Sequence, residues 1–429
     1  MTTSEFILQH RLSNPRDLAL QARRYPDVDM PYALNQIQGW QTARQKLPSW
    51  ASCDGVVYPP HLNMEQCSSE PTARYKQEVA LRWLNKLGVG HGEATTSMAD
   101  LTGGFGVDFS FTSRCFASAT YVERNSSLCD VVSGNLPRLG ISNANVVCAE
   151  AEDYLATMPQ QTMLFLDPAR RDEHGAKTVL IADCTPDVCR LLPQLMSKAR
   201  FVMLKLSPML DWHKAIADLK GTVDEVHIVS VGGECKELLL VLAGKVSVSS
   251  VDSGSLENGV RVYCVDIMPK AEADGEYKRS EFCYTIGGAA DNPPTLNPQP
   301  STLNSQLSTL NSQFLFEPNA SIMKAGCFAE LSQAYGVEAI GPNSHLFVSS
   351  GRVEQFPGRK FAIEAVCTLN KRQLKQTLGT LKQANIAVRN FPMSVAELRK
   401  RLKLRDGGDT YIFATTTMEG EHVLIICRK

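Results

Sequence analysis

The most informative local pattern of the chain is a glycine-rich segment between two acids, Asp100-Leu-Thr-Gly-Gly-Phe-Gly-Val-Asp108. It lies where a short apolar run gives way to a helical stretch, and glycines at such a turn let a ligand lie close to the backbone and to the start of the helix. A dinucleotide-binding turn would follow G-x-G-x-x-G, but Phe109 stands in the place of the third glycine. An acid at the strand end, Asp100, favours a cationic ligand over a pyrophosphate. The alternative is a tight turn that binds nothing.

A second candidate site is the segment Leu164-Phe-Leu-Asp-Pro-Ala-Arg-Arg171. It closes a predicted strand, at the edge where open α/β sheets bind ligands. We expect the carboxylate of Asp167 to face a bound molecule there, and the guanidinium groups of Arg170 and Arg171 could hold a phosphate or a carboxylate. The alternative is a structural Asp-Pro turn followed by surface arginines.

Lys205 ends another predicted strand at the same edge of the sheet. It could face the substrate, and the alternative is a lysine whose stem lies along apolar surface. The eight histidines are isolated, and the thirteen cysteines form no C-x-x-C pair and no Cys/His cluster with zinc spacing. We therefore expect neither a hydrolase triad nor a metal site.

The glycine-rich segment resembles the first motif of class I S-adenosylmethionine-dependent methyltransferases, D-x-T-x-G-x-G-x-D. Further features of that family follow in order: Glu123 ends the second predicted strand, Glu150 follows the third, and a hairpin spans 225–243. The resemblance implies that Glu123 binds the ribose hydroxyls and that Glu150 meets the adenine amino group. Taken singly, these two acids would more simply be solvated loop residues. The cofactor turn itself would comprise Asp100, Thr102, Gly103, Gly104, Gly106 and Asp108.

In the same family, Asp-Pro-Pro or Asn-Pro-Pro at the end of the fourth strand marks methylation of a base nitrogen. An amine that attacks a sulfonium methyl develops positive charge, which a fixed carboxylate and neighbouring carbonyls stabilise. The resemblance implies that Asp167 and Pro168 occupy the catalytic position, and we expect Asp167, Pro168 and Arg170 to be the catalytic residues. The sequence departs from the family pattern, because Ala169 replaces the second proline and no aromatic residue follows to stack on a flipped base.

Hydroxyl groups precede the glycine-rich segment, at Ser68, Ser69 and Thr72. In several RNA methyltransferases, the trimethylguanosine synthases among them, a similar S/T-x-E segment closes over the methionine end of the cofactor. We therefore expect Ser68 and Ser69 at the cofactor. The alternative is that Ser69 simply caps the helix that begins here.

The charge of the chain is unevenly distributed. Its 44 Lys and Arg residues nearly balance its 45 Asp and Glu residues, so a nucleic-acid partner needs a local basic patch. Residues 352–405 supply one, with thirteen basic and three acidic side chains, a net charge of +10. Such a segment would bind phosphates in a salt-dependent way. The alternative is a set of solvated helix faces.

These candidate residues need a scaffold that brings strand ends together. From about residue 97, short apolar runs alternate with helical stretches, which predicts a parallel sheet covered by helices. Only 232–236 separates the last two runs, so that pair must be an antiparallel hairpin. We predict an α/β fold, a Rossmann-like seven-stranded methyltransferase sheet with an antiparallel last strand. The predicted strands are 97–101, 119–123, 145–148, 163–166, 201–206, 225–231 and 238–243.

Patterns outside this sheet divide the rest of the chain. We predict an N-terminal helical region at 1–92, the methyltransferase domain at 93–245, a small accessory β/ferredoxin-like segment at 246–290, a low-complexity linker at 291–314 and a C-terminal α+β domain at 315–429. The C-terminal part, with Glu317-Pro-Asn-Ala-Ser-Ile-Met-Lys-Ala-Gly326 and Arg389-Asn-Phe-Pro392, resembles the THUMP-like domain that follows a class I methyltransferase in some bacterial proteins. THUMP domains proper deliver structured RNA such as tRNA, so the resemblance implies RNA binding by analogy.

Together these patterns predict an S-adenosyl-L-methionine-dependent methyltransferase that acts on a base nitrogen of RNA, tRNA or rRNA, and binds it through 352–405. A small-molecule or protein methyltransferase is one alternative, and a non-catalytic RNA-binding protein that retains the fold is another. No apolar run reaches the ~20 residues of a membrane span, and the N-terminus has no signal-peptide core. We therefore expect a cytoplasmic protein without a membrane partner.

Overall fold

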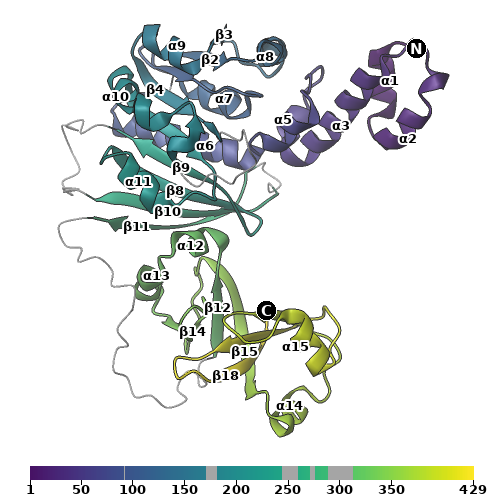
Figure 1. Ribbon diagram of the computed structural model, residues 1–429, viewed down its shortest axis with the longest axis vertical. Helices are drawn as coiled ribbons and strands as arrows, with labels where there is room; N and C mark the ends of the chain where they lie inside the picture. The colour runs from purple at the N-terminus through teal and green to yellow at the C-terminus, as the bar shows by residue number, and fades with distance from the viewer. Residues whose placement is uncertain (91, 171–180, 244–258, 271–275, 288–312) are drawn as a thin grey trace. The chain divides into compact units, whose positions relative to one another are not determined.

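The computed structural model describes residues 1–90, 92–170, 181–243, 259–270, 276–287 and 313–429 (Figure 1). Arg171 lies outside these residues, and so does the predicted linker at 291–314 except for its last two positions. The chain divides into two compact units. The first comprises Met1–Val231, Lys236–Leu256 and Pro269–Tyr277, and the second comprises Gly232–Cys235, Glu257–Met268 and Lys278–Lys429.

The N-terminal part of the first unit is helical, as the sequence predicts. Its helices are α1 (Thr3–His10), α2 (Pro15–Leu20), α3 (Met30–Lys46), α4 (Pro48–Ala51), α5 (His61–Gln66) and α6 (Glu70–Lys86). Side-chain caps define their starts: Asn14 accepts a hydrogen bond from the Arg16 N–H at the start of α2, and Asp29 accepts one from Tyr32 at the start of α3. Such caps satisfy backbone donors that a helix leaves unpaired. The longest buried face belongs to α6, which includes Ala73, Lys76, Val79, Ala80 and Trp83.

The central sheet has the predicted alternation of strands and helices. Its parallel strands are β1 (Ser97–Asp100), β2 (Ser118–Glu123), β3 (Ala144–Cys148), β4 (Gln161–Leu166) and β7 (Ala199–Leu206). The hairpin of β8 (Val223–Val231) and β9 (Glu234–Leu242) closes the series, and β9 runs antiparallel to β7. The helices between the strands are α7 (Val107–Thr112), α8 (Ser126–Arg138), α9 (Ala151–Thr157), α10 (Val188–Lys198) and α11 (Trp212–Asp218).

The number of strands in this sheet differs from the sequence prediction. The order is β11-β10-β8-β9-β7-β4-β1-β2-β3, so the seven predicted strands are consecutive within a sheet of nine. The extra pair is the antiparallel hairpin of β10 (Val260–Ile267) and β11 (Arg279–Ile286). These strands fall in the segment 246–290 that the sequence assigned to an accessory element. An alternating pattern predicts a strand, but it does not say which sheet edge that strand joins.

The C-terminal part of the second unit is the predicted α+β domain. Its strands follow the order β13-β14-β12-β15-β18-β17-β16. They are β12 (Phe314–Pro318), β13 (Glu338–Ala339), β14 (Phe347–Ser349), β15 (Gly358–Thr368), β16 (Asn385–Val388), β17 (Thr410–Thr416) and β18 (His422–Arg428). The helices are α12 (Ala320–Ala325), α13 (Phe328–Tyr335), α14 (Lys371–Leu378) and α15 (Val395–Leu402). One core cluster packs α14 and α15 through Leu378 and Leu398 against Ile412 and Leu424 of the sheet.

Among the described helices, none combines the length and the apolar character that crossing a membrane requires.

Candidate functional site

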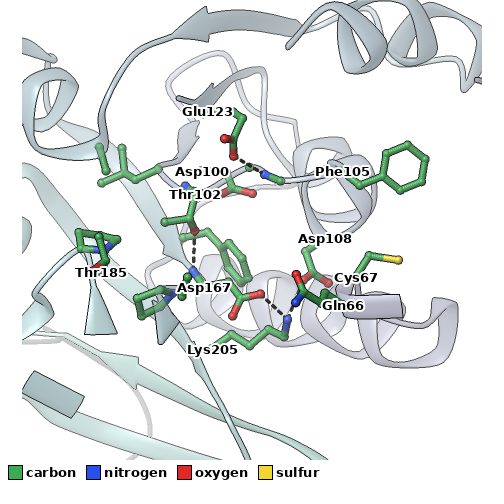
Figure 2. Close-up of a pocket in the computed structure, with 18 of the residues that line it drawn as sticks. Gln66, Cys67, Asp100, Thr102, Phe105, Asp108, Glu123, Asp167, Thr185 and Lys205 are labelled. Carbon is green, nitrogen blue, oxygen red and sulfur yellow. Dashed lines mark hydrogen bonds and ion pairs between the residues drawn. The ribbon is translucent and has the colours of Figure 1, made fainter. Parts of the chain in front are cut away.

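A pocket of about 720 Å³ opens at the carboxyl ends of the parallel strands of the first unit. The ends of β1, β2, β4 and β7 all reach it. The last residue of α5, Gln66, also lines the pocket, together with Cys67 and Ser68 of the connection to α6. Parallel strands place their carboxyl ends at one edge, which is where open α/β sheets bind ligands. The two candidate segments of the sequence therefore meet in one cavity (Figure 2).

Glycines shape the turn that forms one wall of this pocket. A Cβ on Gly103 would lie 2.1 Å from the ring of Tyr121, so no larger residue fits at this position unless that ring moves. Gly106, the residue before α7, has a φ of +77° and so lies in the left-handed region, which favours glycine. Glycine is therefore required at 103 by packing against Tyr121 of β2 and favoured at 106 by the backbone of the turn.

Asp100 and Thr102 connect this turn to the second candidate segment. The buried Asp100 carboxylate accepts a hydrogen bond from the Thr102 N–H at 3.0 Å, and the Thr102 hydroxyl oxygen accepts one from the Asp167 N–H at 2.6 Å. Burial raises the pKa of Asp100 well above its usual value, and the nearby carboxylates of Asp108, Asp167 and Glu123 add to the effect. Thr102 therefore holds the end of β4 against the turn after β1.

Glu123 and Glu150, which the sequence assigned to the cofactor, both line the pocket. Glu123 accepts hydrogen bonds from the N–H groups of Gly104 at 2.9 Å and Asn125 at 2.8 Å. These bonds hold the carboxylate in place at the end of β2. Glu150 occupies the position before α9 and its side chain is exposed.

Buried ion pairs continue from the pocket into the core, as a series that we call the charge chain: Glu237, Lys76, Asp108, Lys205 and Asp167. The Lys76 ammonium is fully buried and lies 2.7 Å from Glu237 Oε2 and 3.2 Å from Asp108 Oδ1. Lys205 Nζ lies 3.9 Å from Asp108 Oδ2 and pairs directly with Asp167 Oδ2. Figure 2 shows Lys205 between these two carboxylates.

Burial and charge act in opposite directions on Lys205. Burial alone would lower its pKa, but the carboxylates of Asp167, Asp108 and Glu237 outweigh burial and raise the pKa above the usual range. Lys205 therefore remains an ammonium ion at neutral pH and is not suited to accept a proton. Burial also raises the pKa of Glu237, against the attraction of Lys76 and Lys205.

The other predicted site residues occupy varied positions. Ser68 lines the pocket and donates a hydrogen bond to Asp108 Oδ2 at 2.7 Å, whereas Ser69 lies outside the lining. Ser69 is the residue before α6, but its side chain makes no capping bond, and its hydroxyl lies 3.3 Å from that of Thr72. Pro168 lines the pocket, and Arg170 belongs to the short strand β5 (Ala169–Arg170), which pairs with β6 (Cys184–Thr185).

Sequence reasoning missed Lys76 and Glu237, although one signal was present for Lys76. This lysine falls among the apolar residues of α6, three positions after Ala73 and three before Val79, so it lies on the helix face that the pattern assigns to the core. A buried lysine needs a partner. The identity of that partner, Glu237, has no local signal.

The basic segment 352–405 divides into paired and unpaired cations. Arg359 and Arg389 both pair with the buried carboxylate of Glu317, through hydrogen bonds of 2.6 Å and 2.8 Å. Arg352 pairs with Glu354, and Arg399 pairs with Asp406. The net charge of +10 thus overstates the charge available to a partner, because Glu317 and Asp406 lie outside the segment that was counted.

Eight exposed cations of this segment have no ion-pair partner among the residues that the structure describes, and we call them the exposed basic set. They lie on α14, on the loop after it, and at the end of α15 and beyond: Lys371, Arg372, Lys375, Lys382, Lys400, Arg401, Lys403 and Arg405.

Within the described part of the chain, no group of three or more His, Cys, Asp or Glu side chains is placed to hold a metal ion.

Comparisons with known proteins assign two families to the second unit. Residues 358–429 match the family described as THUMP domain-like, and residues 314–357 match a family described as a ferredoxin-like domain. The segment 246–290, for which the sequence predicts an accessory β/ferredoxin-like fold, lies outside both matches. A search of curated proteins found no match.

Among solved structures, the chain is similar to a crystal structure from Porphyromonas gingivalis W83 of a protein proposed to be a methyltransferase. The two share 28% identity with a TM-score of 0.75, over 93% of this chain and 90% of that one. With the strand order described above, this similarity identifies the fold of the first unit as that of a class I methyltransferase, and the C-terminal domain is THUMP-like.

Two further structures are similar to smaller parts of the chain. An rRNA methylase from Streptococcus thermophilus shares 12% identity over 40% of this chain and 96% of that one, with a TM-score of 0.30. A proposed methyltransferase from Streptococcus mutans, in complex with SAH, shares 10% identity over 39% and 96%, with a TM-score of 0.29. TM-scores this low support no inference about this chain.

Proposed function

We propose that this protein is an S-adenosyl-L-methionine-dependent methyltransferase that modifies a base nitrogen of tRNA or rRNA. The observation that carries the proposal is the pocket at the carboxyl edge of the sheet. It brings the glycine-rich turn after β1 together with Asp167 and Pro168 after β4. A methyl donor and an acceptor atom need these two parts within one cavity.

The residues around the pocket fit such a cofactor. The volume of about 720 Å³ lies within the range typical of small-molecule sites. The carboxylates of Glu123 and Glu150 can accept hydrogen bonds from hydroxyl and amino groups, and both acids line the pocket. The glycine turn would hold the cofactor through Asp100, Thr102, Gly103, Gly104 and Gly106. When bound, S-adenosylmethionine would supply a methyl group activated by a sulfonium.

Asp167 would be the main catalytic group. Its carboxylate is 38% exposed, and it lies in the cavity rather than on the outer surface. A carboxylate at this place can orient an attacking amine, accept its N–H and stabilise the positive charge that develops on nitrogen. The Pro168 carbonyl would add a second acceptor.

The exposed basic set supports RNA as the substrate. Its eight cations lie on residues that match the THUMP-like family, and exposed Lys and Arg side chains attract phosphates in a salt-dependent way. All thirteen cysteines are free thiols, which fits a reducing compartment such as the cytoplasm.

A non-catalytic RNA-binding protein is the second candidate. The observation that favours it is Ala169, which stands in place of the second proline that the base-nitrogen methyltransferases carry.

The test is transfer of tritiated methyl from S-adenosylmethionine to total RNA from cells that lack this gene, with protein and small-molecule fractions assayed in parallel. We expect label in RNA with the wild-type protein and none with Asp167→Ala. Label confined to another fraction would move the substrate away from RNA. Cofactor binding without any transfer would favour the non-catalytic candidate.

A further inference from the structure

Lys205 lies directly beside the proposed catalytic carboxylate because of the strand register. β4 and β7 are parallel neighbours, with Leu166 opposite Leu204, so the next residues along each strand are Asp167 and Lys205. The Lys205 ammonium forms an ion pair with Asp167 Oδ2, because the register of the two strands places these residues side by side. One oxygen of Asp167 is therefore occupied by a cation of the same sheet edge.

The two members of this pair differ in their access to solvent. The Lys205 side chain is 12% exposed, whereas Asp167 is 38% exposed. Both side chains line the pocket, and the ammonium is the less exposed of the two groups. Lys205 is placed to hold Asp167 through Oδ2, and this ion pair does not use Oδ1.

Lys205 is itself held from behind by the rest of the charge chain. Its second carboxylate neighbour is Asp108, at 3.9 Å, and Asp108 also accepts the Ser68 hydroxyl at 2.7 Å. On its other oxygen, Asp108 faces Lys76 at 3.2 Å, and Lys76 is fully buried against Glu237. Each charge along this route has a neighbour of opposite sign, which is what makes buried charges tolerable.

The chain of contacts points to a role for Lys205 that no sequence motif indicated. We propose that Lys205 is a positioning residue that fixes the Asp167 carboxylate for the incoming nucleophile, with Asp108 fixing Lys205 in turn. This inference rests on the proposed function, since it concerns how Asp167 is oriented for methyl transfer. It also gives Asp108, the last acid of the glycine-rich motif and a residue of the pocket lining, a role in holding Lys205.

The experiment compares three variants of the full chain with the wild type: Lys205→Met, Lys205→Arg and, as a matched control, Lys86→Met. Lys86 also faces a largely buried carboxylate, Glu225 at 3.9 Å, but it does not line the pocket. Methyl transfer from S-adenosylmethionine to total RNA from cells lacking the gene gives kcat and KM. Calorimetric titration with S-adenosylmethionine gives Kd, and thermal unfolding gives Tm.

We expect Lys205→Met to lower kcat by about 100-fold, the cost of a catalytic group misplaced by about 1 Å, with Kd for S-adenosylmethionine unchanged. Lys205→Arg should recover most of that loss, because it restores a cation beside Asp167. Lys86→Met should leave kcat unchanged. The proposal is overturned if Lys205→Met keeps the wild-type kcat. It is also overturned if both Lys205 variants show a lower kcat, a lower Tm and a higher Kd for S-adenosylmethionine, as a purely structural role requires.

A crystal structure of the Lys205→Met variant tests the inference without a measurement of activity. We expect the Asp167 carboxylate to leave its place beside residue 205, while Asp108 keeps its contacts with Ser68 and Lys76. An Asp167 carboxylate that stays in place overturns the inference. If the wild type transfers no methyl to any fraction, the proposed function fails, and this structure still tells whether Lys205 positions Asp167.

Discussion

Charged side chains are arranged in opposite ways in the two units. In the first unit, Lys76, Lys205, Asp108 and Glu237 are withdrawn from solvent and paired. In the second unit, the cations of the exposed basic set are exposed to solvent, and they have no ion-pair partner in the described part of the chain. Salt screens exposed charges beyond about 10 Å and affects buried pairs much less. The first arrangement suits holding a side chain in place, and the second suits attracting a polyanion.

The second unit also contains a buried carboxylate that pairs with two arginines, so the contrast concerns only its unpaired cations. Glu317 is buried and pairs with Arg359 of β15 and with Arg389, the residue directly after β16. These two arginines belong to the basic segment by sequence, but they are occupied by an acid of the same domain. Counting charge along a sequence therefore does not separate cations that stabilise a fold from those that face a partner.

The largest effect we expect is loss of catalysis when Asp167 is changed to Ala. Removing a group that orients the nucleophile and accepts its proton should lower kcat by about 1,000-fold. RNA affinity should not change, since the exposed basic set lies in the other unit. Single-turnover methyl transfer and RNA binding measure the two effects separately. Asp218→Ala, which removes a surface partner of Lys214, is the matched control. Equal activity of the two variants would contradict this assignment.

Lys76→Met should have the largest effect on stability. It leaves Glu237 buried without its main partner, and breaking a buried ion pair typically costs about 3–5 kcal/mol. Urea unfolding measures this change in the free energy of unfolding. The double variant Lys76→Met/Glu237→Gln should be more stable than Lys76→Met alone, because the uncompensated charge is gone. A single variant as stable as the wild type would show that the charge chain does not stabilise the first unit.

Replacing Lys371, Arg372 and Lys375 together by Ala should weaken RNA binding without affecting S-adenosylmethionine binding. Each lost phosphate contact makes the slope of log K against the logarithm of the salt concentration shallower by about one unit. We therefore expect a lower affinity and a shallower slope in a salt titration. Arg352→Ala is the matched control, because that arginine is already paired with Glu354. An unchanged slope in the triple variant would remove α14 from the interface.

The smallest effect should follow from Ser394→Ala. Ser394 forms a capping box with Glu397 at the start of α15, the helix that carries Lys400 and Arg401. Loss of such a cap costs about 1 kcal/mol, so we expect a small fall in the free energy of unfolding of the second unit and a small loss of RNA affinity. Ser394→Asp, which can still cap the helix, should retain both. Equal losses in the two variants would mean that capping is not the cause.

Much of the candidate site was accessible from the sequence. The glycine-rich turn, Glu123, Glu150 and Asp167 were all named from local patterns, and all line one pocket. The reason is that each follows a strand of a parallel sheet, and such a sheet gathers the carboxyl ends of its strands at one edge. Recognising the order of the strands was therefore enough to bring together residues far apart in the chain.

The rest of the site depends on packing that no local pattern describes. Lys76 and Glu237 are 161 residues apart, and they meet because α6 packs where the side chains of β9 point. Gln66 at the end of α5 and Cys67 directly after it line the pocket because of the same kind of packing. The apolar face of α6 indicates that Lys76 is buried, but no local pattern says which carboxylate it meets or that Gln66 and Cys67 reach the pocket.

The sequence by itself determined most of the helices and strands, the glycine-rich turn after the first strand of the sheet, and the edge at which Asp167 would lie. Hydrophobic periodicity and backbone sterics are local, so a short stretch of sequence is sufficient to read them. Only the tertiary structure decided the partners of the charges, including the pairing of Lys205 with Asp167 and of Arg389 with Glu317. An ion pair forms where two side chains are brought within a few ångströms, and that distance is set by how whole elements pack.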